Sequence, residues 1–200
     1  MRRIVRDIPF EIDYRAFFSL LKYDWHRGYV LEEFHKKVLK LIEKGYELSE
    51  ARGVYSIELI ITKEKNRIVL ASGMTLEGTA ISRHCQDYTH VFLMAVTIGE
   101  KLEKEIERSE PDEAVILDAF GSEAAEAAAE SLNSIIKREA VHAGFYTFNY
   151  RFSPGYADFP LSTNKDFETY LQIEEIGIKV TETYMLLPRK SITAVIPARK

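Results

Sequence analysis

Three residue types suited to holding a ligand stand close together in the segment 151–156, which reads Arg-Phe-Ser-Pro-Gly-Tyr. The guanidinium of Arg151 can bind a planar carboxylate through two parallel hydrogen bonds. Gly155 lets a ligand approach the backbone closely, and the ring of Tyr156 offers a hydroxyl group and a face that attracts cations. The same residues also fit a simple Pro-Gly turn beside an ordinary surface arginine, so the motif alone leaves both readings open.

Two predicted elements position this segment. Aromatic residues alternate with more polar ones over residues 145–152, which predicts a strand with Arg151 at its end, on the polar face. Before it, residues 113–139 form the strongest helix pattern, with alanines that favour a helix and permit close packing.

The rest of the chain alternates helices with hairpins. An amphipathic helix is predicted over residues 30–44, and a charged helix closed by Pro111 over residues 100–109. A shorter helix over 164–174 is expected to turn Phe167, Tyr170 and Leu171 inward. Residues 91–96 form an apolar run typical of a strand buried on both faces. Hairpins are predicted over 55–71 and over 178–196, the second turning at residues 188–190. These patterns predict an α+β fold, a largely antiparallel, twisted sheet flanked by helices, in one domain over residues 1–200.

Composition narrows the classes of function. The formal net charge of −4 argues against nucleic acid as a partner, since phosphate binding needs a basic face. No run approaches the roughly 18 apolar residues that cross a bilayer, and no apolar signal core follows the N-terminus. The single cysteine, Cys85, excludes an internal disulfide framework and fits a reducing cytoplasm.

Other candidate sites are weaker. His84, Cys85 and His90 cluster before the apolar run, but a metal site would need Asp87 as well, so we predict no metal. The aromatic run at 143–150 has a faint likeness to an RNA-recognition strand, which the acidic balance opposes. The absence of a glycine-rich phosphate loop argues against a doubly wound, nucleotide-binding methyltransferase.

Four motifs in order resemble the reactivation domain of cobalamin-dependent methionine synthase. Arg-x-x-x-Gly-Tyr at 151–156 looks like the S-adenosylmethionine-binding signature of that family. The likeness continues with Ile-Asp-Tyr-Arg-Ala-Phe-Phe at 12–18, Ala-Glu-Ala-Ala-Ala-Glu at 125–130 and Val-Thr-Glu-Thr-Tyr-Met at 180–185, followed by Pro188 and Ser191. Together these motifs span residues 12–193, which makes the set more specific than any one of them.

The resemblance implies a ligand site at the positions that match the family motifs. The ligand contacts fall on Asp13, Glu126, Arg151 and Tyr156, and Gly155 shapes the floor. Arg151 would take the carboxylate of S-adenosylmethionine, and an acid such as Asp13 would take its ammonium group. For Glu126, a solvated helix face or a capping partner is the alternative.

The sequence also departs from the family pattern. The family continues after Gly-Tyr with Pro-x-Cys-Pro, whereas residues 157–160 read Ala-Asp-Phe-Pro. The aromatic pair on the last strand of the family, another ligand contact, falls on Ile196 and Pro197. Contacts to adenine or ribose are therefore expected to differ.

The function implied by the resemblance is methionine synthase reactivation, in which S-adenosylmethionine is held for reductive methylation of cobalamin. In this family the domain positions the methyl group, and a reduced flavoprotein or similar donor supplies the electron. The sequence shows no cobalamin-binding motif, so cobalamin would be carried by a separate methionine synthase that lacks its own reactivation domain. Two alternatives stay open: a stand-alone S-adenosylmethionine-dependent methyltransferase, and a corrinoid-protein partner that has lost S-adenosylmethionine binding.

Overall fold

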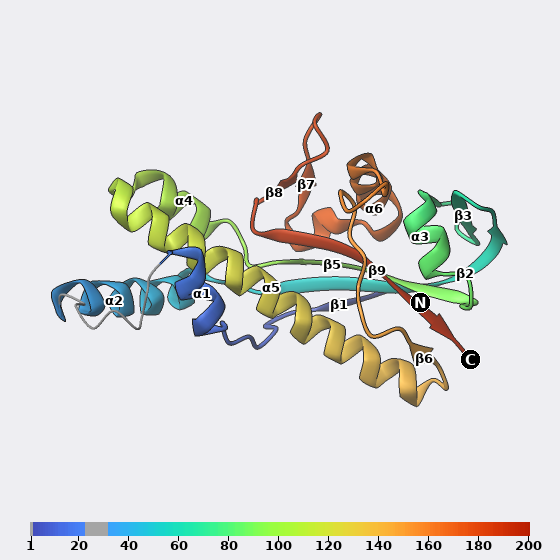
Figure 1. Ribbon diagram of the computed structural model, residues 1–200, viewed down its shortest axis with the longest axis horizontal. Coiled ribbons are helices and arrows are strands. Elements are labelled where there is room, and N and C mark those ends of the chain that lie inside the picture. Colours follow the sequence, from blue (N-terminus) through green and yellow to red (C-terminus); the bar gives the residue numbers. More distant parts are fainter. Residues whose placement is uncertain (1, 23–31) are drawn as a thin grey trace.

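The computed structural model describes residues 2–22 and 32–200 and contains an antiparallel sheet with helices on both faces (Figure 1). Its strands run in the order β4-β3-β2-β5-β9-β6, and β1 pairs with the first half of β2 on the edge away from β5, the edge that β3 joins further along. Every strand pair is antiparallel, which confirms the predicted α+β class. The strands of this sheet are β1 (Arg2–Val5), β2 (Arg52–Lys63), β3 (Arg67–Leu70), β4 (Thr75–Glu77), β5 (His90–Thr97), β6 (Tyr146–Thr147) and β9 (Ser191–Arg199).

The centre of the sheet is β5, flanked by β2 and β9. Every residue of β5 except His90 is buried, as the apolar run predicted. Alternate residues of this strand face opposite sides, so Phe92 and Met94 belong to one hydrophobic core, and Val91 and Leu93 to a second core on the other face. Burial on both faces explains why the run shows no polar alternation.

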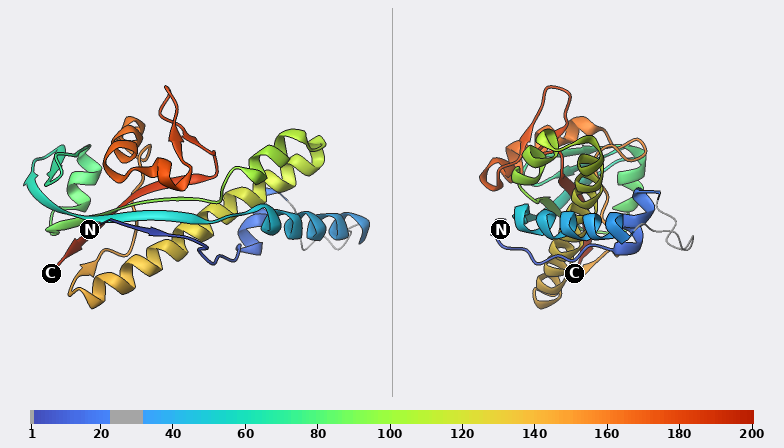
Figure 2. Two further views of the ribbon diagram at one scale, coloured as in Figure 1. Left: turned by 180° about the vertical axis from the view of Figure 1, so that it is seen from behind. Right: turned by 90° about the vertical axis from the view of Figure 1, so that its left-hand side faces the viewer.

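One face of the sheet is covered by the long helix α5 (Pro111–His142), which crosses it obliquely (Figures 1 and 2). Four of its alanines, Ala124, Ala125, Ala128 and Ala129, are buried and let the helix lie close to the strands. Helices α1 (Tyr14–Leu20), α2 (Glu32–Leu48) and α4 (Lys101–Arg108) pack around its first half. Pro111 does not close α4 as predicted. It begins α5, because proline at the first helical position loses no intrahelical hydrogen bond.

The predicted helix over residues 30–44 corresponds to α2. Val38, Leu41 and Ile42 are buried as the pattern required, whereas Phe34 is more exposed than predicted. Val30 and Leu31 lie outside the described residues. Among the residues that the structure describes, no helix combines the length and the apolar character required to cross a bilayer.

The second face carries α3 (Thr79–His84), α6 (Asn164–Leu171) and the short 3₁₀ helices η2 (Leu161–Thr163) and η3 (Ile173–Ile176). Phe167 and Leu171 are fully buried, as predicted. Tyr170 is 40% exposed, so its predicted inward position is wrong. The α-helix ends at Leu171 because Gln172 adopts a left-handed conformation, so the predicted helix over 164–174 is two shorter segments.

The two predicted hairpins have different outcomes. β2 and β3 form the first hairpin, with a bulge near Ile60. The second prediction placed its turn at 188–190 and is wrong: β7 (Lys179–Val180) pairs with β8 (Leu186–Leu187), and the chain turns at residues 181–185. β9 instead joins the central sheet beside β5, where its buried apolar residues are covered on both faces.

Candidate functional site

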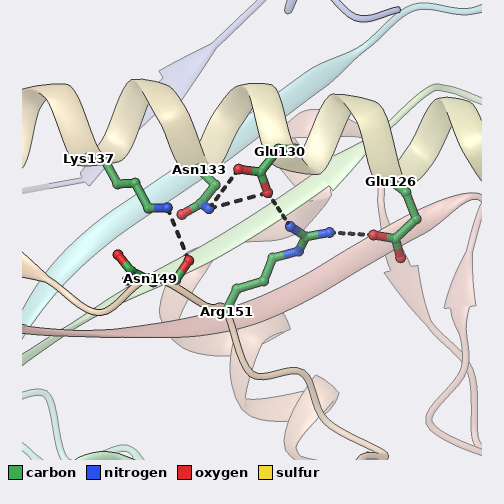
Figure 3. A network of polar contacts seen from close by, with 6 residues as sticks. All are labelled: Glu126, Glu130, Asn133, Lys137, Asn149 and Arg151. Carbon is green, nitrogen blue, oxygen red and sulfur yellow. Dashed lines mark hydrogen bonds and ion pairs between the residues drawn. The ribbon is translucent and has the colours of Figure 1, made fainter. Parts of the chain in front are cut away.

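The segment that leads to Arg151 is not the continuous strand predicted over residues 145–152. After β6, the N–H of Phe148 still donates to the carbonyl oxygen of Pro197 at 2.7 Å, and Phe152 returns to the sheet through a bridge to Val195. Between them the backbone leaves the ladder, and the carbonyl oxygen of Asn149 accepts a hydrogen bond of 3.1 Å from Lys137 on α5. This departure directs Arg151 toward α5 instead of along a strand face (Figure 3).

Arg151 lies between two carboxylates on the same side of α5. It forms ion pairs with Glu126 and with Glu130, whose Oε2 atom is 2.8 Å from Nη1. The arginine side chain is 18% exposed, whereas the two glutamates are more than half exposed. The resemblance had placed Glu126 and Arg151 in one site, and the structure brings them into direct contact. Glu126 is also 57% exposed, so the alternative of a solvated helix face stays open alongside this contact.

Glu130 is a member of the site that the sequence reasoning missed. It follows Glu126 by four residues on one helix, a spacing that places both carboxylates on the same face. Glu130 could therefore have been predicted from its spacing to Glu126. The position of Arg151 between the two glutamates could not be predicted, because it depends on the irregular path of the backbone after β6.

The Arg-x-x-x-Gly-Tyr loop is a tight turn. The N–H of Gly155 donates to the carbonyl oxygen of Phe159 at 2.8 Å, and φ of Gly155 is +91°, a conformation that disfavours any residue with a side chain. Tyr156 projects from this turn and is 64% exposed. Gly155 thus shapes the site through the backbone, and the structure does not require it as a ligand contact.

The residues that depart from the family pattern stabilise this loop. The carboxylate of Asp158 accepts hydrogen bonds from the backbone N–H groups of Thr79 and Ala80 at the start of α3, at 2.6 and 2.9 Å. These bonds lower the pKa of Asp158. Phe159 is buried and stacks on Phe152 with ring centroids 5.8 Å apart. The replaced residues therefore hold the turn against the sheet.

Asp13 has a structural task in addition to its predicted contact. It is the N-cap residue of α1, and its Oδ1 atom accepts hydrogen bonds from the N–H groups of Arg15 and Ala16 at 2.8 and 3.2 Å. An N-cap aspartate stabilises a helix by roughly 0.5–2 kcal/mol. The side chain nevertheless lines a groove that Glu126 and Arg151 also line.

Three hollows meet around Glu126. A groove of about 820 Å³ between α5 and the α1 region contains Asp13 and Arg151. A cavity of about 340 Å³ between α5 and the segment 149–156 contains Arg151 and Tyr156. A smaller hollow of about 190 Å³ extends from Tyr156 toward β8 and β9. Glu126 lines all three, so four of the five predicted site residues border hollows that share this side chain.

Acidic residues dominate the groove. Five carboxylates line it, with only Arg138 and Arg151 as basic partners; they belong to Glu11, Asp13, Glu123, Glu126 and Glu130. Burial, followed by the charges of Asp13 and Glu126, raises the pKa of Glu123. Such a lining attracts a positively charged ligand, and it offers Arg151 as the place for a negatively charged group.

The histidine and cysteine cluster has a packing role. His84 lies against Phe148 and Phe152, with ring centroids 4.8 and 5.1 Å apart, and His90 lies against Phe145. Cys85 is fully buried, and burial raises the pKa of its thiol to about 12. Across residues 2–22 and 32–200, no group of three or more histidine, cysteine or acidic side chains is arranged to hold a metal ion.

Ile196 and Pro197 occupy the positions where the resemblance expects an aromatic ligand-contacting pair. Both are buried in β9, where they pair with Phe92 and Val91 of β5. Ile196 belongs to the core beneath α5. At these two positions the side chains are therefore packed within the sheet.

The sequence model of the family described as vitamin B12 dependent methionine synthase, activation domain, matches residues 79–200. The chain belongs to this family. The matched range contains Glu126 and the Arg151 loop, whereas Asp13 precedes it. Membership in the activation-domain family confirms the resemblance seen in the sequence motifs.

The fold agrees with this family. A solved structure of the MetH reactivation domain bound to AdoHcy is similar with a TM-score of 0.70 and 15% sequence identity, over 98% of this chain and 78% of that one. At this identity the likeness establishes the fold. No curated protein sequence is significantly similar to this activation-domain chain.

Proposed function

We propose that this chain binds S-adenosylmethionine and presents its methyl group to cobalamin carried by a separate methionine synthase. The observation that carries the proposal is that Arg151, Glu126, Tyr156 and Asp13 line adjoining hollows in a chain of the activation-domain family. A structurally similar protein was solved with AdoHcy bound. AdoHcy has the same adenosyl group and amino-acid head group as S-adenosylmethionine, so this neighbour supports the same class of ligand.

The charges of the site suit the ligand. S-adenosylmethionine carries a carboxylate, an ammonium group and a sulfonium, so its net charge is positive. Arg151 would receive the carboxylate by exchanging part of its contact with the two glutamates. The acidic groove would attract the two cations, and the exposed ring of Tyr156 offers a further cation-binding face.

The chain's own residues would act by positioning. The sulfonium of S-adenosylmethionine supplies an activated methyl group, which needs no acid or base from this chain. What Arg151 and the acidic groove would contribute is the orientation of the methyl group toward an acceptor. The turn fixed by Gly155 and Asp158 would keep Tyr156 in a constant position.

An external acceptor fits the exposed surface around the site. Tyr150, Tyr156 and Met185 are half to three-quarters exposed and border the two hollows on the Tyr156 side. Exposed aromatic and methionine side chains are enriched at protein interfaces. We propose that the cobalamin-carrying partner docks here, transiently and in the cytoplasm, and that a reduced flavoprotein or similar donor supplies the electron.

Calorimetric titration tests the ligand assignment. The parent protein is expected to bind S-adenosylmethionine more tightly than S-adenosylhomocysteine, because only the former carries the sulfonium charge that the acidic groove attracts. A protein that binds neither compound would instead support the corrinoid-protein partner that has lost its ligand. Methylation of a small substrate by the purified chain alone would support the stand-alone methyltransferase.

A further inference from the structure

A stripe of polar residues on α5 faces the segment 149–151 (Figure 3). Residues three and four positions apart lie on the same side of a helix, and this spacing links Glu126, Glu130, Asn133 and Lys137. Lys137 donates to the carbonyl oxygen of Asn149, and Arg151 forms ion pairs with the two glutamates. The stripe therefore holds both the backbone that leads to Arg151 and the arginine side chain itself.

The two glutamates of the stripe are held unequally. The Oε2 atom of Glu130 is 2.8 Å from Nη1 of Arg151, and its two carboxylate oxygens lie 3.3 and 3.4 Å from Nδ2 of Asn133. Asn133 is 1% exposed, so this second donor is fixed in the core. Among the residues that the structure describes, Glu126 pairs with Arg151 alone, and it lines all three hollows. Glu130 is thus anchored by two donors, whereas Glu126 is anchored by one.

The guanidinium of Arg151 can keep one glutamate and still bind a ligand. It carries N–H groups on Nε as well as on both Nη atoms. Glu130 accepts from Nη1 and Glu126 from Nη2, and the described hydrogen bonds of Arg151 leave Nε without an acceptor. A planar carboxylate binds two adjacent N–H groups in parallel, and Nε together with Nη2 forms such a pair. This pair becomes available when Glu126 leaves Nη2, with Glu130 still on Nη1.

We infer that Glu130 is a positioning residue that orients Arg151, and that the carboxylate of the ligand replaces Glu126 while Glu130 stays in place. The inference rests on the proposed binding of S-adenosylmethionine and adds the residue that prepares Arg151 for it. Immobilising a long side chain on binding costs affinity. Glu130 lowers this cost because it orders the guanidinium before the ligand arrives.

Calorimetry of Glu130→Ala with two ligands tests the role. Decarboxylated S-adenosylmethionine has no carboxylate, so its binding does not use the orientation of Arg151. The affinity for S-adenosylmethionine, divided by the affinity for the decarboxylated compound, should therefore fall about two- to tenfold, the effect of immobilising one long side chain. Because Glu130 is exposed and alanine favours a helix, the variant should fold as the parent does.

Glu11→Ala is the matched control for charge. Glu11 lines the same groove and has no described contact with Arg151. Removing its charge should weaken the decarboxylated compound more than S-adenosylmethionine, because the decarboxylated compound carries the larger positive charge. The affinity ratio should therefore stay constant or rise in Glu11→Ala, which is opposite in direction to the change expected for Glu130→Ala.

A double-mutant cycle separates positioning from a general effect on α5. A residue that acts through Arg151 has no further effect once Arg151 is absent. In the Arg151→Ala protein, Glu130→Ala should therefore not lower the affinity ratio any further.

Nitrogen NMR of the arginine side chains provides a measurement without ligand. Rotation about the Nε–Cζ bond exchanges Nη1 with Nη2, and an anchored guanidinium rotates slowly. The two Nη signals of Arg151, identified by their loss in Arg151→Ala, should be separate in the parent and in Glu126→Ala. In Glu130→Ala they should merge.

Four results would overturn the inference. An affinity ratio of Glu130→Ala that equals or exceeds that of Glu11→Ala would reduce Glu130 to a groove charge or a competitor of the ligand, and would leave the proposed function intact. An equal fall of the ratio in the Arg151→Ala background would assign the effect to α5. Signals that merge in Glu126→Ala and stay separate in Glu130→Ala would exchange the roles of the two glutamates. A parent protein that binds no S-adenosylmethionine would overturn the proposed function and this inference together.

Discussion

Replacing Arg151 by alanine should change which ligand the site prefers. The substitution removes the carboxylate-binding group from a groove lined by five acidic side chains and leaves Arg138 as its one basic side chain. Loss of a charge-assisted pair lowers affinity by roughly 1.5–3 kcal/mol, or about ten- to hundredfold, for S-adenosylmethionine. Decarboxylated S-adenosylmethionine has no carboxylate to lose and meets a more negative groove, so its affinity should stay constant or increase.

The same variant should remain folded. Glu126 and Glu130 are more than half exposed, and exposed ion pairs contribute about 1 kcal/mol or less each. Without the arginine, the two glutamates four residues apart on α5 repel each other by about 0.2–0.5 kcal/mol. The unfolding temperature should therefore fall by only a few degrees.

Competitive calorimetry with the two ligands measures the preference directly. Arg138→Ala is the matched control, because it removes the same charge from the same groove without touching the Arg151 pair. It should change the ratio of the two affinities much less than Arg151→Ala does, because it makes the groove more negative without removing the partner of the carboxylate. If Arg151→Ala weakens both ligands equally, or neither, then Arg151 does not hold the carboxylate and the reasoning from its position is refuted.

Three further outcomes follow from the structure. Burial raises the pKa of Glu123 in the folded protein above its ordinary value of 4.5. The stability that this group contributes to folding should therefore decline as the pH rises from 4.5 to the raised pKa of the folded state. Binding of a cationic ligand should release the proton of the Glu123 carboxyl group, so affinity for the ligand should increase over the same pH range. Calorimetry in two buffers measures this proton release, and Glu123→Gln should abolish it. Cys85 should resist a thiol reagent in the native protein and react after unfolding, since burial raises its pKa to about 12; rapid native reaction would contradict its buried position. Gly155→Ala should destabilise the fold by about 1–2 kcal/mol in thermal unfolding and also weaken S-adenosylmethionine binding, because φ is +91°. Gly144→Ala, at φ of +77° and outside the three hollows, should affect stability alone.

Local patterns predicted the elements whose burial is regular. The apolar run at 91–96 and the alanine-rich helix could be predicted, because the pattern of buried residues is regular along each of them. The second hairpin could not be predicted, because the start of the segment 178–196 can pair either with residues 186–187 or with the strand that follows. That this last strand, β9, joins the central sheet depends on the distant strand β5.

The motifs indicated Asp13, Glu126, Arg151 and Tyr156 as one group, and these residues line neighbouring hollows that share Glu126. The contacts among them were not predictable. The path of residues 149–151 away from the sheet determines that Arg151 meets Glu130 and that Asn133 faces a cavity. No local pattern encodes that path, because it depends on contacts with α5 and β9, which are distant in the sequence.

Reconstitution with a cobalamin enzyme is the most direct test of the proposed function. Oxidised methionine synthase that lacks its own reactivation domain is mixed with this protein, S-adenosylmethionine and a reductant, and methionine formation is followed. We expect activity to recover only when this protein is present, and to fall with Arg151→Ala or Tyr156→Ala. If methionine formation does not depend on this protein, or if both variants restore it as well as the parent does, the proposed role in reactivation is contradicted.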